Sequence, residues 1–477
     1  MDSTGTHISD KISGDKKPAA EPKPTTAEPE FRSVTRLAHE SDKLKEESPA
    51  PKKASEYTTI HKEEYFNRKK APEIVSPIDE SNWSPTQVRF VPPYYPLERS
   101  NRFVEFSLET VALRISEANR ILSIHAIYDN KNATATLLTS ENVEMHLSLW
   151  KTSAKTGESA NPEGIVVEVQ RRKGDSIAFH RYSRLILDVA AGDIKTNKVA
   201  EHKGDYLDVV YSRNVQRTSD PKDSETEYEN AIIAVEIAHG LIMKDRIDAR
   251  QLGLESLCLL TDPKKTGVAT ALIASRVVLL GSLQDINSSS SAPEEGLMVD
   301  ETPFQEIRQT LLSLIQFKRI GDDELFEGDE PEHITVLHNL ALAVLANALN
   351  VIADDSIHEQ ASSPEEGTVG RSRLDTSESI SEKFLEDSLE CSDNHEIMKT
   401  LISELGKAST KPHNACLSAK CLNSVCRASV KARKRAEDLG AKQVVESALK
   451  VGTKTHLKLE QECGKVLTTL RSANPNE

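Results

Sequence analysis

The chain has 477 residues and a formal net charge of −15, with 37% hydrophobic and only 4% aromatic residues. Its length allows two or three domains, but this composition predicts that a sizeable part lies outside any hydrophobic core. The six cysteines lack disulfide-type spacing. The first residues form no apolar signal segment, and no apolar run reaches the ~18 residues of a membrane span, so we expect a cytoplasmic, reduced protein.

The negative charge is concentrated in three segments, residues 285–301, 321–332 and 353–395, which hold five, seven and twelve acidic residues. Only the last of them also contains basic residues. The rest of the chain is therefore mildly basic. We interpret the three segments as acidic disordered insertions in a folded, mildly basic protein, so the net charge alone does not exclude binding to anions.

The N-terminal residues 1–95 are rich in Pro, Lys, Glu and Ser and show little periodicity, which predicts a disordered arm. Its last part, residues 83–95, contains aromatic residues and prolines. We expect that part to dock onto the domain that follows.

Residues 96–195 are predicted to form an α+β domain. Ser107 caps a helix over residues 107–120, in which Val111 and Ile115 share an apolar face. Strands are predicted at 122–128, 133–138, 143–150 and 165–172, and a second helix at 176–191. The order α-β-β-β-β-α suits an antiparallel sheet with both helices on one face.

The last strand, turn and helix of this domain carry a cluster of basic residues. Ile165, Val167 and Val169 alternate with polar positions, as in a half-buried strand. The sequence from Lys173 to Asp175 is typical of a turn, and Asp175 or Ser176 can cap the helix. The cluster, our candidate site for an anion or a lipid head group, is Arg171, Arg172, Lys173, His180, Arg181 and Arg184.

This segment resembles the end of the kinase-associated 1 (KA1) domain found at the C-terminus of some protein kinases. The similar pattern falls on Arg171, Arg172, Gly174, Ser176, Ile177, Ala178 and Phe179. The resemblance implies binding to anionic lipid surfaces. The chain departs from those kinases because it contains no glycine-rich loop with a strand lysine, no HRD-type loop and no DFG.

Two other interpretations of the basic cluster remain open. It can be a solvated helix face whose charge is balanced by Glu168, Asp175 and Asp188. It can also bind the protein's own acidic insertions, which would compete with external anions and inhibit the site. Deleting residues 353–394 should then strengthen binding to liposomes.

A linker over residues 196–224 leads to a helical domain over residues 225–475. Helices are predicted at 228–243, 248–260, 263–280, 303–317, 333–352, 396–405, 413–436 and 442–470. The runs around Gly253-Leu254 and Gly440-Ala441 resemble armadillo repeats, in which such pairs allow close helix packing. Helices this apolar must stack on one another, which favours an armadillo-like solenoid of about four repeats.

The sequence gives little support for a catalytic site or a metal-binding site. His413, Cys416, Cys421 and Cys426 lie at spacings that do not put their side chains on one helix face, so buried core cysteines are the better interpretation. No nucleophile elbow and no phosphate-binding loop occur. We therefore predict no cofactor and no metal. The basic run 431–435 closes a helix in preference to directing nuclear import.

The sequence thus favours a non-enzymatic adaptor. Its helical repeats would bind a protein partner, and its KA1-like domain would bind an anionic membrane surface or an acidic segment, with no nucleic acid involved. The expected location is cytoplasmic, with peripheral membrane attachment as an option. The alternatives are a regulatory subunit of a protein kinase and an enzyme of an unrecognised class.

Overall fold

The computed structural model describes residues 83–152, 164–199, 224–283, 301–316, 331–354, 380–386 and 397–471. Residues 1–82 of the arm predicted over residues 1–95, nearly all of the linker and most of the three acidic insertions lie outside these ranges. Residues 83–95, the part of the arm expected to dock, lie within them, and Trp83 is buried. Ser76–Glu477 forms one compact unit, and every contact described below lies within it. We call its first half the α+β part and its second half the helical part.

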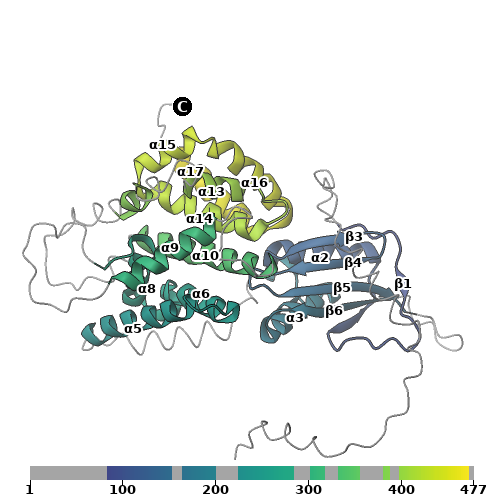
Figure 1. Cartoon of the computed structure of the whole chain (residues 1–477). Helices are drawn as coiled ribbons and strands as arrows, with labels where there is room; N and C mark the ends of the chain where they lie inside the picture. The colour runs from purple at the N-terminus through teal and green to yellow at the C-terminus, as the bar shows by residue number, and fades with distance from the viewer. Residues whose placement is uncertain are drawn as a thin grey trace, which may run out of the picture. The chain divides into compact units, whose positions relative to one another are not determined.

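The α+β part contains a mixed sheet and two helices (Figure 1). Its elements are β1 (Arg89–Phe90), β2 (Asn101–Val104), α2 (Leu108–Leu122), β3 (His125–Asp129), β4 (Thr134–Leu138), β5 (Glu144–Lys151), β6 (Ile165–Lys173), α3 (Ser176–Ala191) and the 3-10 turn η4 (Thr196–Lys198). The predicted antiparallel sheet, with one helix before and one after its four main strands, is confirmed. The short strands β1 and β2 are additions that the sequence did not predict.

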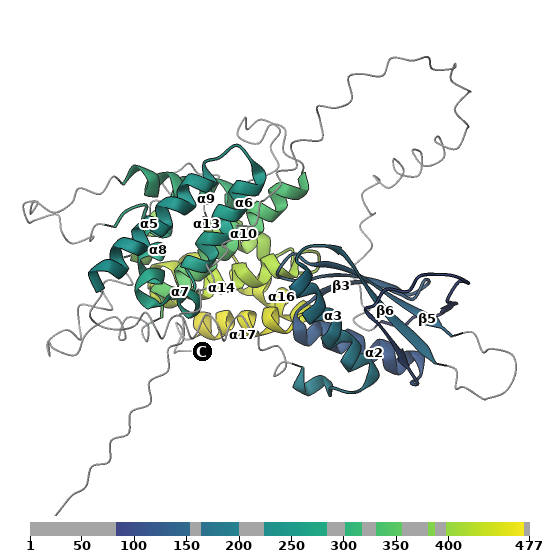
Figure 2. The same ribbon diagram turned by 90° about the horizontal axis from the view of Figure 1, so that it is seen from below.

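Five strands follow the order β2-β6-β5-β4-β3 and pair antiparallel, while β1 pairs parallel with the end of β5. Both helices cover one face of the sheet (Figure 2). Ile115 of α2 and Ile186 of α3 pack there against Leu147 and Val167. The predicted caps are confirmed, because Ser107 accepts a hydrogen bond from the amide of Thr110 and Asp175 accepts one from Ala178.

The other face of β6 is covered by residues 89–98, which we call the strap. Glu168 on this face is fully buried. Its carboxylate accepts hydrogen bonds from the backbone amide of Glu98 (2.8 Å), from Trp150 Nε1 (3.0 Å) and from the Tyr95 hydroxyl (3.3 Å). The strap therefore buries residues 165–169 on both faces, and the predicted half-buried strand is wrong for these residues.

Besides a seven-residue helix described below, the described residues of the helical part form helices of 9 to 22 residues and one short helical turn. They are α5 (Ser224–Ile242), α6 (Ile247–Leu260), α7 (Pro263–Thr266), α8 (Val268–Leu280), α9 (Thr302–Gln316), α10 (Pro331–Ile352), α13 (Ile397–Leu405), α14 (Pro412–Ala428), α15 (Val430–Asp438), α16 (Ala441–Thr455) and α17 (Leu457–Arg471).

Three predicted helices are each divided in two. The division of 263–280 falls at Gly267, whose φ of 89° lies in the left-handed region. The division of 413–436 falls at Ser429, whose side chain caps α15 by accepting from the amide of Ala432. The division of 442–470 falls at His456, which is extended and buried. These breaks let consecutive helices fold back on one another.

The helices pack in pairs that also contact the next pair. α6, α10, α14 and α17 contact one another in succession, and α5, α9, α13 and α16 do the same beside them. Gly253 allows α6 to approach α5 closely, because a Cβ there would lie 2.9 Å from the carbonyl oxygen of Ala238 in α5. Gly440 acts differently from the prediction: it has a φ of 73° and forms the turn before α16, with no backbone packed against it.

A short helix at residues 380–386 lies inside the segment predicted as the third acidic insertion. Its Ile380 and Phe384 are 3% and 1% exposed and join the core of the helical part. Glu382 accepts hydrogen bonds from Ser429 and Lys431. The apolar pair at i and i+4 anchors these seven residues to the folded protein.

Among the described residues, one helix, His333–Ile352, is long and apolar enough to cross a membrane. Half of it is buried within the protein, as also happens in the central helix of a globular core. Its length and composition are therefore weak evidence for a span.

Candidate anion-binding site

The turn between β6 and α3 places basic residues at one end of the sheet. Gly174 has a φ of 93°, and a Cβ there would lie 2.7 Å from the carbonyl oxygen of Asn142 and 2.8 Å from the Cα of Val143. Only glycine fits such a position without strain. Asp175 then caps α3 at once, so the chain passes from strand to helix in a tight turn.

Five of the six predicted site residues are exposed around this turn, and we call them the basic rim: Arg171, Arg172, Lys173, His180 and Arg184. Arg171 donates to the carbonyl oxygen of Gly174 at 2.9 Å, which fixes it beside the turn. Arg172, together with burial, lowers the pKa of His146 on the neighbouring strand, burial being the larger cause. The rim therefore brings together residues from the strand, the turn and the helix.

The sixth predicted residue, Arg181, is held inward. Its side chain is 20% exposed and pairs with Glu141 at 2.5 Å. Glu141 also accepts from the Tyr182 hydroxyl at 3.1 Å, and the guanidinium lies 5.0 Å from the Tyr182 ring. Burial and the Glu141 carboxylate raise the pKa of Tyr182 to about 12, so the phenol stays protonated. Arg181 is thus engaged with Glu141 and Tyr182 and does not belong to the exposed rim.

The acidic residues expected to balance the rim are largely committed elsewhere. Glu168 is buried under the strap, on hydrogen bonds of its own. Asp175 accepts the capping bond from the Ala178 amide at 2.7 Å. Asp188 lies 3.7 Å from Arg184 and 2.9 Å from Arg102. The interpretation of a face neutralised by these three residues therefore holds only for Arg184 and Asp188.

Ile177 is the residue of this site that sequence reasoning missed. It lies in the first turn of α3, is 69% exposed and shares the outer face of the helix with His180 and Arg184. The signal was available, because positions 177, 180 and 184 recur at helical spacing. Ile177 thus adds an exposed apolar side chain to the cationic surface of the rim.

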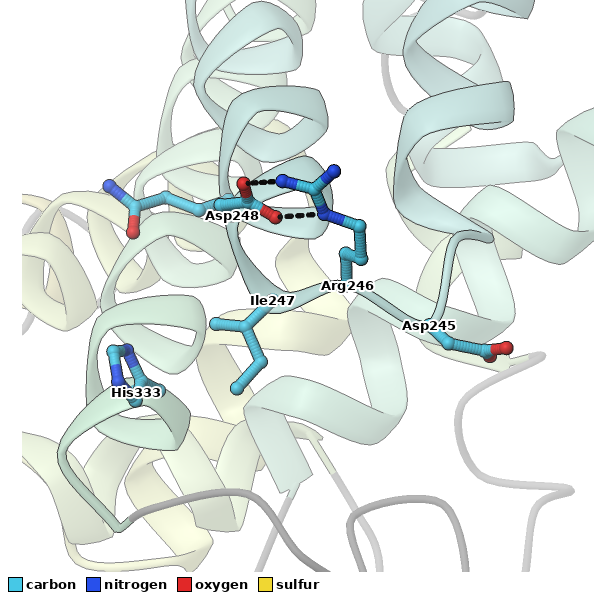
Figure 3. Close-up of a pocket in the computed structure, with 6 residues that line it drawn as sticks. Asp245, Arg246, Ile247, Asp248 and His333 are labelled. Carbon is cyan, nitrogen blue, oxygen red and sulfur yellow. Dashed lines mark hydrogen bonds and ion pairs between the residues drawn. The ribbon is translucent and has the colours of Figure 1, made fainter. Parts of the chain in front are cut away.

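Two surface pockets elsewhere are weaker candidates. One, of about 420 Å³, lies between the α5–α6 turn and the start of α10 (Figure 3). Its cation, Arg246, is paired with Asp248 through two nitrogens at 3.1 and 2.5 Å. The other, of about 330 Å³, lies beside the end of α3. Its Arg114 is stacked 4.0 Å from the Phe106 ring. The arginine of each pocket is already engaged within the protein.

The cysteines behave as core residues. The five that lie in described segments are free thiols, and burial raises the pKa of each to about 12. Such thiols stay protonated at neutral pH and are poor nucleophiles and ligands. Within the described residues, no three His, Cys, Asp or Glu side chains converge as a metal site.

Comparison with known proteins adds no family. No family model matches the chain, and no curated protein matches it significantly. The crystal structure of an engineered protein from the Northeast Structural Genomics Consortium matches with 16% identity and a TM-score of 0.21, over 57% of this chain and 98% of that one. A score this low does not show a shared fold. The candidate site therefore rests on its own residues.

Proposed function

We propose that the protein is a non-enzymatic adaptor, whose α+β part binds an anionic lipid surface through the basic rim and whose helical part binds a protein partner. The observation that carries the proposal is Ile177, exposed among the cations of the rim. At a membrane surface an apolar side chain enters the acyl boundary while arginine and lysine remain at the phosphates.

The expected affinity is modest. Each Lys or Arg near an anionic surface contributes about 1 kcal/mol. Three such residues, Arg171, Arg172 and Lys173, contribute about 3 kcal/mol, which corresponds to a Kd of about 6 mM. Stable attachment therefore needs a second contact, as a single weak membrane anchor usually does. The resemblance to the KA1 domain supports lipid as the ligand, and a protein partner would supply that second contact.

The test is co-sedimentation of the full chain with liposomes containing 30% phosphatidylserine or phosphatidylcholine alone. We expect binding to the anionic liposomes only, weakening with salt. Reversing the charge of Arg171, Arg172 and Lys173 to Glu should abolish it. The matched control reverses Lys195 and Lys198, at the opposite end of α3. Equal binding of the two variants would overturn the lipid proposal.

Ile177 separates insertion from simple charge attraction. Ile177→Ser keeps every charge, so loss of binding in this variant shows that the apolar side chain enters the membrane. Binding that stays unchanged in Ile177→Ser but is lost in the charge-reversed variant indicates a purely electrostatic contact.

The alternative ligand of the rim is the protein's own third acidic insertion, residues 353–395. Because Ile380 and Phe384 belong to the core, the deletion should be confined to residues 355–379. Stronger liposome binding after this deletion indicates that the segment occupies the rim, and unchanged binding indicates that it does not.

For the helical part, the successive packing of α6, α10, α14 and α17 beside α5, α9, α13 and α16 supports an armadillo-like stack of helix pairs. Stacks of this kind present extended surfaces to partners. The exposed apolar residues lie mostly on the first pair: Tyr228, Ile233, Ile237 and Met243 on and beside α5, and Leu252 on α6.

The charge around this surface indicates the kind of partner. Glu229 and Glu236 are exposed beside Ile233 and Ile237, and residues 224–243 contain no lysine or arginine. An amphipathic helix whose apolar face is flanked by lysine or arginine complements both features. We propose such a helix as the ligand of α5.

A labelled 18-residue model helix with leucine on one face and lysine on its flanks should bind the full chain in fluorescence anisotropy. Its leucine–glutamate counterpart should not. The double variant Ile233→Ser, Ile237→Ser leaves the net charge unchanged. Weaker binding of the model helix to this variant therefore assigns the contact to the exposed apolar residues of α5. The matched control is Ile127→Ser, which alters an isoleucine of the sheet with the same exposure as Ile237. An equal loss in both variants would refute the α5 site.

A further inference from the structure

A chain of hydrogen-bonded histidines joins the helical part to the α+β part. His413, at the start of α14, bonds through Nε2 to the carbonyl oxygen of Leu138 at the end of β4, at 2.9 Å. His456, between α16 and α17, bonds through Nε2 to His413 Nδ1 at 3.1 Å. The backbone amide of Leu459 bonds to His456 Nδ1 at 3.1 Å. His456 is 1% exposed.

The two backbone groups at the ends fix every proton in this chain. The Leu459 amide can only donate, so His456 Nδ1 accepts and its proton lies on Nε2. His456 Nε2 therefore donates to His413 Nδ1, and the His413 proton lies on Nε2, where it donates to Leu138. Both rings are neutral, and each of their four nitrogens has a partner.

An added proton has no place in this arrangement. On His456 Nδ1 it would face the Leu459 N–H, and on His413 Nδ1 it would face the His456 N–H. Either position replaces a hydrogen bond by two opposed donors. Protonation of either ring therefore costs one hydrogen bond beside the junction, at the start of α17 or between the two rings, whereas the bond from His413 Nε2 to the Leu138 carbonyl is kept.

Burial and the neighbouring basic groups also favour the neutral form of these histidines. Burial, then His413, Lys458 and His125, lower the pKa of His456 to about 3, and burial with His413 lowers that of His125, at the start of β3, to about 4. The Lys458 amide donates to Ser123 Oγ at 3.0 Å.

The carboxylates facing the junction are already paired. Arg120 of α2 lies 3.2 Å from Glu460 of α17 and 2.9 Å from Glu117 of its own helix. Neither carboxylate is therefore positioned to stabilise an imidazolium among His125, His413 and His456.

We propose that these histidines form an acid-sensitive latch, which holds the helical part against the α+β part near neutral pH and releases it when they are protonated. The sign follows from the depressed pKa values of His125 and His456. The closed form is favoured above their ordinary pKa of about 6.5, and it weakens as pH falls below that value.

The size of the effect follows from the same values. Consider a histidine that stays neutral in the closed form and has its ordinary pKa in the open form. Lowering the pH from 7.5 to 5.5 then shifts the equilibrium about tenfold toward the open form. His125 and His456 together give about a hundredfold.

The amide of Lys458 reports the latch directly, because it donates to Ser123 of the α+β part, and the amide of Leu459 reports the hydrogen bond to His456. Hydrogen–deuterium exchange of the full chain, corrected for the intrinsic rate at each pH, should show their opening constant rise about a hundredfold from pH 7.5 to 5.5. A rise of less than threefold would overturn the proposal. So would a rise confined to pH below about 4.5, where carboxylates ordinarily titrate.

Two variants test whether the histidines cause the pH-dependent rise in the opening constant. His456→Gln removes one of the two groups and should reduce the pH-dependent rise to about tenfold. The matched control is His180→Gln, on the exposed rim, which should keep the full hundredfold. If circular dichroism shows that His456→Gln does not fold, His125→Gln gives the same test, because His125 lies outside the hydrogen-bonded chain. A full hundredfold rise in the histidine variant would overturn the latch.

Discussion

Ionisable side chains gather at the basic rim and at the histidine junction, and burial gives the two groups opposite properties. At the rim, Arg184 is 84% exposed and water solvates its charge. At the junction, His456 is 1% exposed and its nitrogens bond only within the protein. The rim can therefore attract an external anion at little cost in folding stability, whereas the junction contributes to stability only while it stays neutral.

Glu168 is a third case: its side chain is fully buried and its carboxylate accepts two hydrogen bonds from the strap and one from Trp150 of β5. It lies only four residues before Arg172, on the same face of the same strand. The difference between them is made by residues 89–98, which cover one and not the other. Exposure at this sheet is thus decided by a segment about 70 residues away in the sequence.

The largest effect is expected at Glu168. Glu168→Ala leaves the Glu98 amide, Trp150 Nε1 and the Tyr95 hydroxyl without their acceptor, which should cost about 3 kcal/mol of unfolding free energy. Both tryptophans of the chain, Trp83 and Trp150, lie in the α+β part, so denaturant unfolding followed by tryptophan fluorescence reports this part alone. Glu98→Ala, which keeps its amide, is the control and should cost less than about 0.5 kcal/mol. A loss below about 1 kcal/mol in Glu168→Ala would contradict the role of the strap.

A smaller effect is expected at the junction. His456→Ala removes the hydrogen bonds that His456 makes with the Leu459 amide and with His413, which should cost about 2 kcal/mol at pH 7.5. At pH 5.5 the cost should shrink by about 1.4 kcal/mol, because protonation already weakens the native contact by about tenfold. Urea unfolding followed by far-ultraviolet circular dichroism measures both values. A cost that is equal at the two pH values would show that His456 packs without titrating.

The local part of this comparison could be predicted from the sequence. Alternation in Ile165–Lys173, a glycine in the turn and an aspartate cap are short-range signals, and they located the basic residues correctly. The aromatic residues in 83–95 predict that this part docks, but neither strand β1 nor the contact of the strap with Glu168 could be predicted this way. β1 has two residues and pairs with Trp150 and Lys151, about 60 positions away, so no periodicity marks it.

The junction escaped prediction for a related reason. Residues 442–470 have good helical periodicity and no proline, which predicts one helix. The break at His456 depends on the close crossing of α16 and α17, where a Cβ on Gly452 would lie 2.6 Å from the amide of Glu460. Gly452, followed by three residues that include two threonines, was the available signal. The partners of His413 and His456 lie in other elements, and only the fold brings them together.

The smallest effect compares two arginines one helical turn apart on α3. Arg181→Ser breaks the 2.5 Å pair with Glu141 in a partly buried setting, so we expect a loss of about 1 kcal/mol. Arg184→Ser should change the unfolding free energy by less than about 0.5 kcal/mol, because Arg184 is exposed and lies 3.7 Å from Asp188. Tryptophan-detected unfolding at 0.1 and 1 M NaCl measures both variants, and the loss in Arg181→Ser should shrink in high salt without vanishing. Equal losses in the two variants would mean that Arg181 belongs to the solvated rim, and the division between structural and available charge on this helix would have to be withdrawn.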